Sequence, residues 1–124
     1  MAYRILVVED EADTREVLTV LLGHEGYLVD TAENGREALA LLAVRSYDLI
    51  LSNLHMPEMS GEDLYRRIDK GWPHLAPRVV FVTADRPDMR FQAQFGGQPV
   101  PVLTKPYTVE HLRQTIGTVI ARDT

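Results

Sequence analysis

Short apolar runs recur along the chain, and polar residues follow each of them. A run of a few apolar residues bounded by turn signals is typical of a strand buried on both faces of a sheet. The strands predicted in this way are Ile5–Val8, Leu49–Leu51, Val79–Val82 and Val100–Leu103. A fifth run, Leu28–Ala32, alternates in polarity, as an edge strand with one wetter face does.

Segments of helical period lie between these strands. Apolar residues recur on one helix face in Val17–Leu22, Ala38–Leu42 and Leu112–Ile120. The segment 85–97 has a looser apolar stripe, with Pro87 suited to a first helical turn. Strands and helices therefore alternate along the whole chain.

Side chains that cap helices predict where the helices begin and end. Each predicted start has a capping oxygen, three of them with an acid three residues later: Asp13 with Glu16, Asn34 with Glu37, Ser60 with Asp63, and Thr108 alone. Glycine and proline mark two helix ends, at Gly23 with Gly26 and at Gly71 with Pro73. A third helix is thus predicted from Ser60 to Gly71.

This alternation predicts a doubly wound α/β fold. The connections are too long for hairpins, so the strands are expected to run parallel and to be joined by right-handed helical crossovers. A chain of 124 residues, 45% of them hydrophobic, suits one core, and we expect one domain over residues 1–124. A domain cut from a longer chain would look the same.

Composition excludes several functions. The formal net charge is -5 and the Lys and Arg residues are scattered, which argues against direct binding of nucleic acid by this domain. The chain has no cysteine, so it has no disulfide framework and no thiolate site. No apolar stretch approaches the length of a signal peptide core or a membrane span, so we expect a cytoplasmic location and no membrane contact.

Polar residues stand at the carboxyl ends of the predicted strands, where doubly wound sheets bind their ligands. Taken singly, each has an ordinary explanation, such as a solvated acidic turn or an exposed loop cation. Their convergence on one sheet edge favours a single site. The residues are Glu9 and Asp10 after the first strand, Asn53 and His55 after the third, Thr83 after the fourth, and Lys105 after the fifth.

These residue types suit magnesium and a phosphoryl group. Mg²⁺ prefers oxygen ligands and is often held by one or two carboxylates, which Glu9 and Asp10 offer. A lysine brings a compact positive charge to a phosphate oxygen, and a threonine hydroxyl donates a hydrogen bond to another. Lys105 and Thr83 fit those two roles.

The motifs that carry these residues resemble the receiver domain of two-component response regulators, the CheY-like family. They are Val7–Glu11, Tyr47–Gly61, Val82–Ala84 and Leu103–Tyr107, and the resemblance covers essentially the whole chain. It implies a five-stranded parallel sheet in the order 2-1-3-4-5 with five flanking helices. It also implies a cis peptide at Lys105–Pro106.

The resemblance further implies a role for each site residue. Glu9 and Asp10 would hold Mg²⁺ together with the acceptor side chain at position 53 and the backbone carbonyl of His55. Thr83 and Lys105 would contact the phosphoryl group. The donor would be a sensor histidine kinase or a phosphotransfer protein, and an output domain or a second copy of the chain would bind through the fourth and fifth helices.

Two positions depart from the family pattern. Asn53 stands where the family has its acceptor aspartate, and an uncharged amide cannot form an acyl phosphate by the usual attack. Val102, three residues before Lys105, stands where ring-switching members carry tyrosine or phenylalanine. The approach to the fifth strand, 96–99, is also unusual and leaves the length of the fourth helix open.

Our leading hypothesis is a phosphoacceptor signalling domain in a non-phosphorylatable form, without the self-catalysed transfer and autodephosphorylation of the family. Asn53 would be an engineered substitution or a natural loss, and the intact Glu9, Asp10, Thr83 and Lys105 favour the former. The alternative is a pseudo-receiver, an interaction module that works without phosphorylation. An enzyme or cofactor binder on a similar sheet is disfavoured, since the acidic first loop lacks a glycine-rich phosphate cradle.

Overall fold

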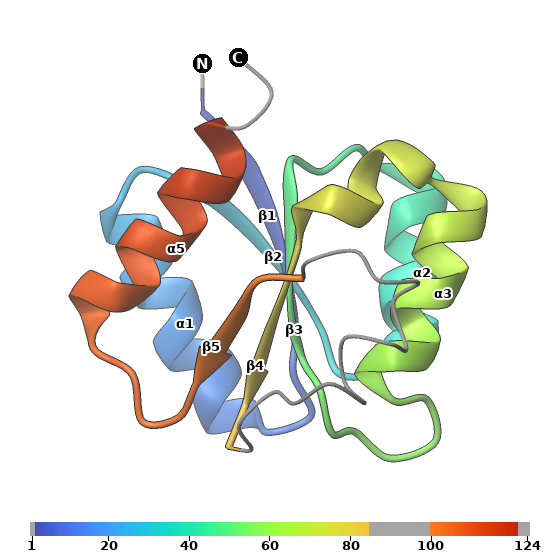
Figure 1. Cartoon of the computed structure of the whole chain (residues 1–124), viewed down its shortest axis with the longest axis horizontal. Helices are drawn as coiled ribbons and strands as arrows, with labels where there is room; N and C mark the ends of the chain where they lie inside the picture. Colours follow the sequence, from blue (N-terminus) through green and yellow to red (C-terminus); the bar gives the residue numbers. More distant parts are fainter. Residues whose placement is uncertain (1, 85–99, 122–124) are drawn as a thin grey trace.

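The computed structural model describes residues 2–84 and 100–121, and in them the five predicted strands form one parallel sheet (Figure 1). The sheet order is β2-β1-β3-β4-β5, which confirms the order implied by the family resemblance. The strands are β1 (Arg4–Val8), β2 (Leu28–Ala32), β3 (Leu49–Asn53), β4 (Val79–Thr83) and β5 (Val102–Thr104).

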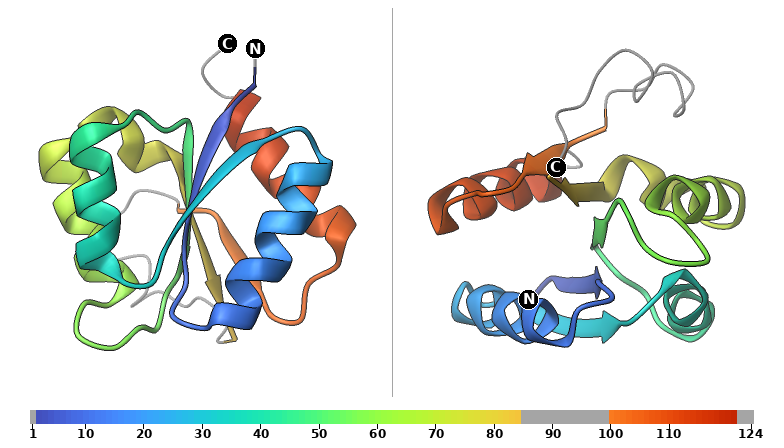
Figure 2. Two further views of the ribbon diagram at one scale, coloured as in Figure 1. Left: turned by 180° about the vertical axis from the view of Figure 1, so that it is seen from behind. Right: turned by 90° about the horizontal axis from the view of Figure 1, so that it is seen from below.

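Helices cover both faces of this sheet. The described helices are α1 (Ala12–His24), α2 (Gly35–Val44), α3 (Gly61–Gly71), the 3₁₀ helix η1 (Pro73–Arg78) and α5 (Val109–Ala121). Figure 2 shows α1 and α5 on one face and α2 and α3 on the other. The predicted helix in 85–97 and the approach at 96–99 lie outside the described residues. No helix in the described ranges is long and apolar enough to cross a membrane.

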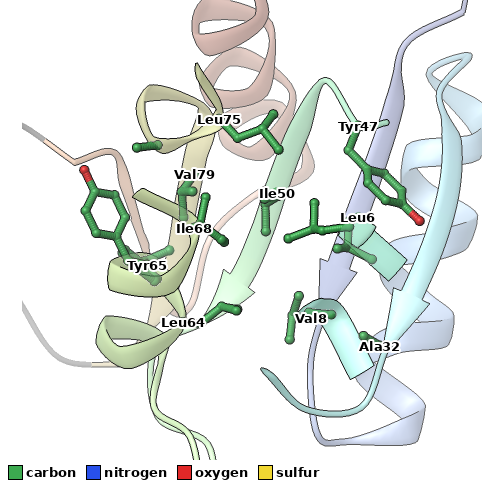
Figure 3. Packing of buried hydrophobic residues seen from close by; sticks show 14 of the residues in the cluster. Leu6, Val8, Ala32, Tyr47, Ile50, Leu64, Tyr65, Ile68, Leu75 and Val79 are labelled. Carbon is green, nitrogen blue, oxygen red and sulfur yellow. The ribbon is translucent and has the colours of Figure 1, made fainter. Parts of the chain in front are cut away.

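The central strands are buried on both faces, which explains their unbroken apolar sequences. In β1, Leu6 and Val8 join the core layer beneath α2 and α3, while Ile5 and Val7 join the layer beneath α1 and α5. All four side chains are fully buried. Figure 3 shows the first layer, in which residues of β1, β3 and β4 pack against α3 and η1.

Three of the four predicted helix caps are confirmed. Asn34 accepts a hydrogen bond from the Glu37 N–H at 2.8 Å, Ser60 accepts one from Asp63, and Thr108 accepts one from His111. The predicted cap at Asp13 is wrong. Helix α1 begins at Ala12, so Asp13 lies inside the first turn, where a carboxylate still interacts favourably with the helix dipole.

The predicted start of the fifth strand is also wrong. Strand β5 begins at Val102, two residues later than expected, although Val100 is buried. The carbonyl of Pro101 accepts a hydrogen bond from the Phe81 N–H at 3.0 Å, but proline has no N–H to donate in return. The strand ladder therefore begins only after the proline.

We predict that Gly61→Ala destabilises the fold. A Cβ at Gly61, the first residue of α3, would lie 2.8 Å from the Phe81 ring and 2.9 Å from the Asn53 carbonyl oxygen. Such overpacking should lower the free energy of unfolding by about 1–3 kcal/mol in urea denaturation. Gly71, at the other end of α3, has nothing within 4 Å of its Cβ position and provides the control. Equal stability of Gly61→Ala and Gly71→Ala would contradict the prediction.

Candidate functional site

The sheet brings the predicted site residues to one edge. Asn53 and Thr83 are the last residues of β3 and β4, while Glu9 and Lys105 directly follow β1 and β5. β1 lies beside β3, and β4 lies between β3 and β5. The Lys105 N–H donates to the Thr83 carbonyl at 2.7 Å, which continues the ladder past the strand ends. The peptide between Lys105 and Pro106 is cis, as the resemblance implied.

The side chain of Asn53 bridges the two acids that follow β1. Its Nδ2 donates to Glu9 Oε2 at 3.0 Å and to Asp10 Oδ1 at 3.2 Å. Its Oδ1 accepts a hydrogen bond from the His55 N–H at 3.3 Å. The amide therefore provides donors where two carboxylates converge, and all its polar atoms are used.

The two acids differ in environment. Glu9 is buried, with 2% of its surface exposed, whereas Asp10 is exposed. Burial, helped by the hydrogen bond with Asp10, raises the pKa of Glu9, and that same hydrogen bond lowers the pKa of Asp10. When the pair takes up a proton, Glu9 is therefore the preferred site.

Lys105 is the described cation that forms an ion pair with the Glu9 carboxylate. Its Nζ lies 4.0 Å from Glu9 Oε1, and 35% of its side chain is exposed. An ion pair this long and this exposed stabilises by less than about 1 kcal/mol. It lowers the pKa of Glu9, but the effect of burial is larger.

A family model for the response regulator receiver domain matches residues 5–117. The chain belongs to this family. It is 38% identical over 121 residues to the sensor histidine kinase AruS of Pseudomonas aeruginosa. The matched region covers 95% of this chain and 12% of AruS. The chain spans from 12% to 51% of the length of the first curated relatives that it matches.

Solved receiver structures share the fold. The chemotaxis protein CheY4 of Vibrio cholerae is 28% identical, with a TM-score of 0.86 over 96% of this chain and 99% of CheY4. The response regulator TrrA of Thermotoga maritima, solved in complex with Mg²⁺ and BeF, is 30% identical, with a TM-score of 0.80 over 96% of this chain and 99% of TrrA. The chain is thus a receiver domain of two-component signalling.

The oxygen atoms of this receiver site suit magnesium. Two carboxylates and one neutral amide meet there, so the site has one negative charge fewer than a site with three carboxylates. Oxygens of Glu9 and Asp10 converge with the Asn53 amide, and one or two carboxylates are a common protein contribution to a Mg²⁺ site. Among residues 2–84 and 100–121, no group of three or more acids, histidines or cysteines forms a metal cluster. The negative charge available to a metal ion at the site therefore comes from the acid pair.

Arg15 is a residue of the site that the sequence did not reveal. Its Nη1 donates to the Glu9 carbonyl oxygen at 2.8 Å, and its Nη2 lies 3.7 Å from Glu33 Oε1. Arg15 thereby fixes the backbone of the acid pair to α1 and to the loop before α2. The only sign of it in the sequence was the arginine itself, in the first turn of the helix that follows the acidic loop.

Val102 lies on β5 and packs against the core layer beneath α2 and α3. Its partner on β4 is Phe81, whose ring centroid lies 6.3 Å from that of Tyr65, with the two ring planes at 48°. Position 102 therefore contributes an aliphatic side chain to the core. That this removes a ring-based relay from Thr83 stays a prediction.

We predict that Glu9→Gln stabilises the chain near neutral pH. The raised pKa means that the folded state favours protonated Glu9, so Glu9 costs stability as the pH rises above the ordinary glutamate pKa. A neutral amide avoids this cost and should add about 1 kcal/mol to the free energy of unfolding at neutral pH. Urea denaturation at neutral and acidic pH measures the difference. A gain that grows as the pH falls would contradict the assignment.

Proposed function

We propose that this receiver domain is built to take a phosphoryl group from a sensor histidine kinase or phosphotransfer protein, and that Asn53 blocks the reaction. Glu9, Asp10, position 53 and the His55 carbonyl would hold Mg²⁺. The observation that carries the proposal is the pair of hydrogen bonds from Asn53 Nδ2 to the two acids. They support a central position for the side chain of residue 53 among the proposed magnesium ligands.

The chemistry explains why an amide blocks the transfer. In the expected reaction, a carboxylate oxygen attacks the phosphorus of a phosphohistidine whose other ring nitrogen is protonated, a P–O bond forms and the P–N bond breaks. The electron pair of the broken bond stays on the ring nitrogen, so the histidine leaves as neutral imidazole. The Asn53 amide has no negative charge, and its nitrogen lone pair is delocalised into the carbonyl. The missing step is therefore nucleophilic attack, while Thr83 and Lys105 would still contact the phosphoryl oxygens.

Similar proteins support Mg²⁺ as the cofactor and a histidine kinase as the partner. TrrA, with the same fold, was solved with Mg²⁺ and BeF, and AruS is a sensor histidine kinase that contains a matching region. Bound Mg²⁺ would neutralise charge on the acids and on the incoming phosphoryl group. An output domain or a second copy of the chain remains our proposal for partners at the fourth and fifth helices.

A phosphorylation-independent interaction module is the second candidate. The observation that favours it is that Asn53 itself satisfies Glu9 and Asp10 through hydrogen bonds, so the acid pair is stable in one fixed state. Retention of Lys105 and Thr83 favours the first candidate, because a pure interaction module has no need of phosphoryl contacts. The two candidates differ in what Asn53→Asp does.

We predict that Asn53→Asp creates a magnesium-dependent phosphoacceptor. The parent chain and the variant are incubated with acetyl phosphate, with Mg²⁺ or with EDTA, and both are weighed by intact mass spectrometry. A phosphoryl adduct is expected only on the variant and only with Mg²⁺, because only then are a nucleophile and its metal present. Asn34→Asp, whose side chain caps α2 by bonding to the Glu37 N–H and not to the acid pair, controls for the added carboxylate.

Two results would contradict this proposal in different ways. Equal adduct on the parent and on Asn53→Asp would show that position 53 is not the acceptor. No adduct on the variant, with its fold intact, would favour the interaction module.

We also predict that Asn53→Asp binds Mg²⁺ about tenfold more tightly than the parent, because a third carboxylate adds charge. In both proteins the affinity should fall as the pH is lowered, since protonation of Glu9, which its raised pKa favours, competes with Mg²⁺. Titrations followed by the amide shifts of Asp10 and Glu11 measure both effects. If neither the substitution nor the lower pH changes the affinity, Mg²⁺ binds away from Asn53 and Glu9.

A further inference from the structure

Three cations of this chain have no ionic or hydrogen-bonded partner within residues 2–84 and 100–121. The other arginines and lysines of these ranges contact an acid or a carbonyl oxygen. The three exceptions all lie on α2 and α3, and all are exposed. They are Arg36, Arg67 and Lys70.

Two of the three line a groove. Arg67, Lys70 and Gly71 from the end of α3 form it with Trp72 and with Leu39 from α2. Figures 1 and 2 show α2 and α3 side by side on one face of the sheet. Leu39 and Trp72 are partly buried and pack against the core, so the groove has an apolar floor and a cationic rim.

Arg36 extends this cationic surface along α2. It precedes Leu39 by three residues, a spacing that places two side chains on the same face of a helix. Arg36 lies in the first turn of α2, where the helix dipole disfavours a cation, and Arg67 precedes the last turn of α3. A favourable interaction with the helix dipole therefore explains the position of Lys70, which lies in the last turn of α3, but not the positions of Arg36 and Arg67.

The polar side chains of the groove are all hydrogen-bond donors. Arg67 and Lys70 have no acceptor group, and the indole of Trp72 has only an N–H, which donates to no atom of the described ranges. The complementary ligand provides carboxylate acceptors and an apolar side chain. A nucleic acid fits less well. Its phosphate backbone needs a larger positive surface than three cations provide, and the chain as a whole has a formal net charge of -5.

We propose that this groove binds an acidic segment of a partner protein, with an apolar side chain on Leu39 and Trp72 and carboxylates on Arg67 and Lys70. The surface is distinct from the phosphoryl site. Helix α3 begins beside Asn53 and rises for about 16 Å to the groove. The partner would thus dock on the receiver independently of position 53.

The experiment selects random peptides on the intact chain by phage display and then measures the enriched peptides by titration. Trp72 is the only tryptophan, so its fluorescence reports directly on the groove. We expect peptides rich in Asp and Glu with an aromatic or aliphatic residue. Their binding should weaken with added salt and change the Trp72 emission.

A matched pair of double variants locates the binding. Arg67→Ala with Lys70→Ala should weaken binding about tenfold, as expected for two lost exposed charge pairs. Arg66→Ala with Arg113→Ala removes the same charge from residues that are already paired, and should bind like the parent. Urea denaturation of each variant verifies that its fold is intact.

Several outcomes would overturn the proposal. They are a failure to enrich any peptide, enrichment of basic or uncharged peptides, equal weakening by both double variants, and an unchanged Trp72 emission. Binding of an oligodeoxythymidine strand at least as tight as that of the acidic peptides would also overturn it, in favour of nucleic acid.

Discussion

The hydrogen bonds from Asn53 to Glu9 and Asp10 are the contact on which the rest of the site depends. Glu9 and Asn53 are 44 residues apart, and they meet because β1 and β3 are neighbours in a parallel sheet. Two adjacent acids, one of them buried, need a donor or a cation between them. The Asn53 amide provides the donors, and a carboxylate there would require the cation instead.

The surrounding structure holds this contact in place from several sides. Arg15 fixes the carbonyl of Glu9, and the Glu11 N–H donates to the Glu9 side chain at 3.2 Å. Gly61 lets α3 begin close against the carbonyl of Asn53. These supports belong to the fold and hold the backbone of the acid pair, while the side chain at position 53 determines how the two carboxylates are satisfied.

The strands and the site edge were predictable from the sequence, because buried parallel strands leave unbroken apolar runs and their carboxyl ends must meet. Asp13 was misplaced because a capping side chain and a first-turn acid look alike in sequence. The start at Val102 was missed because Val100 is as buried as a strand residue. Arg15 and the groove at Trp72 depend on contacts between elements, which no local pattern encodes.

The most direct test is a crystal structure of Asn53→Asp with Mg²⁺ and beryllofluoride, a tetrahedral phosphoryl analogue. Our account predicts a metal ion bound by Glu9, Asp10 and the carbonyl of His55, with the analogue on the new aspartate and in contact with Thr83 and Lys105. A metal or an analogue bound away from this sheet edge, or an aspartate turned away from the two acids, would contradict it.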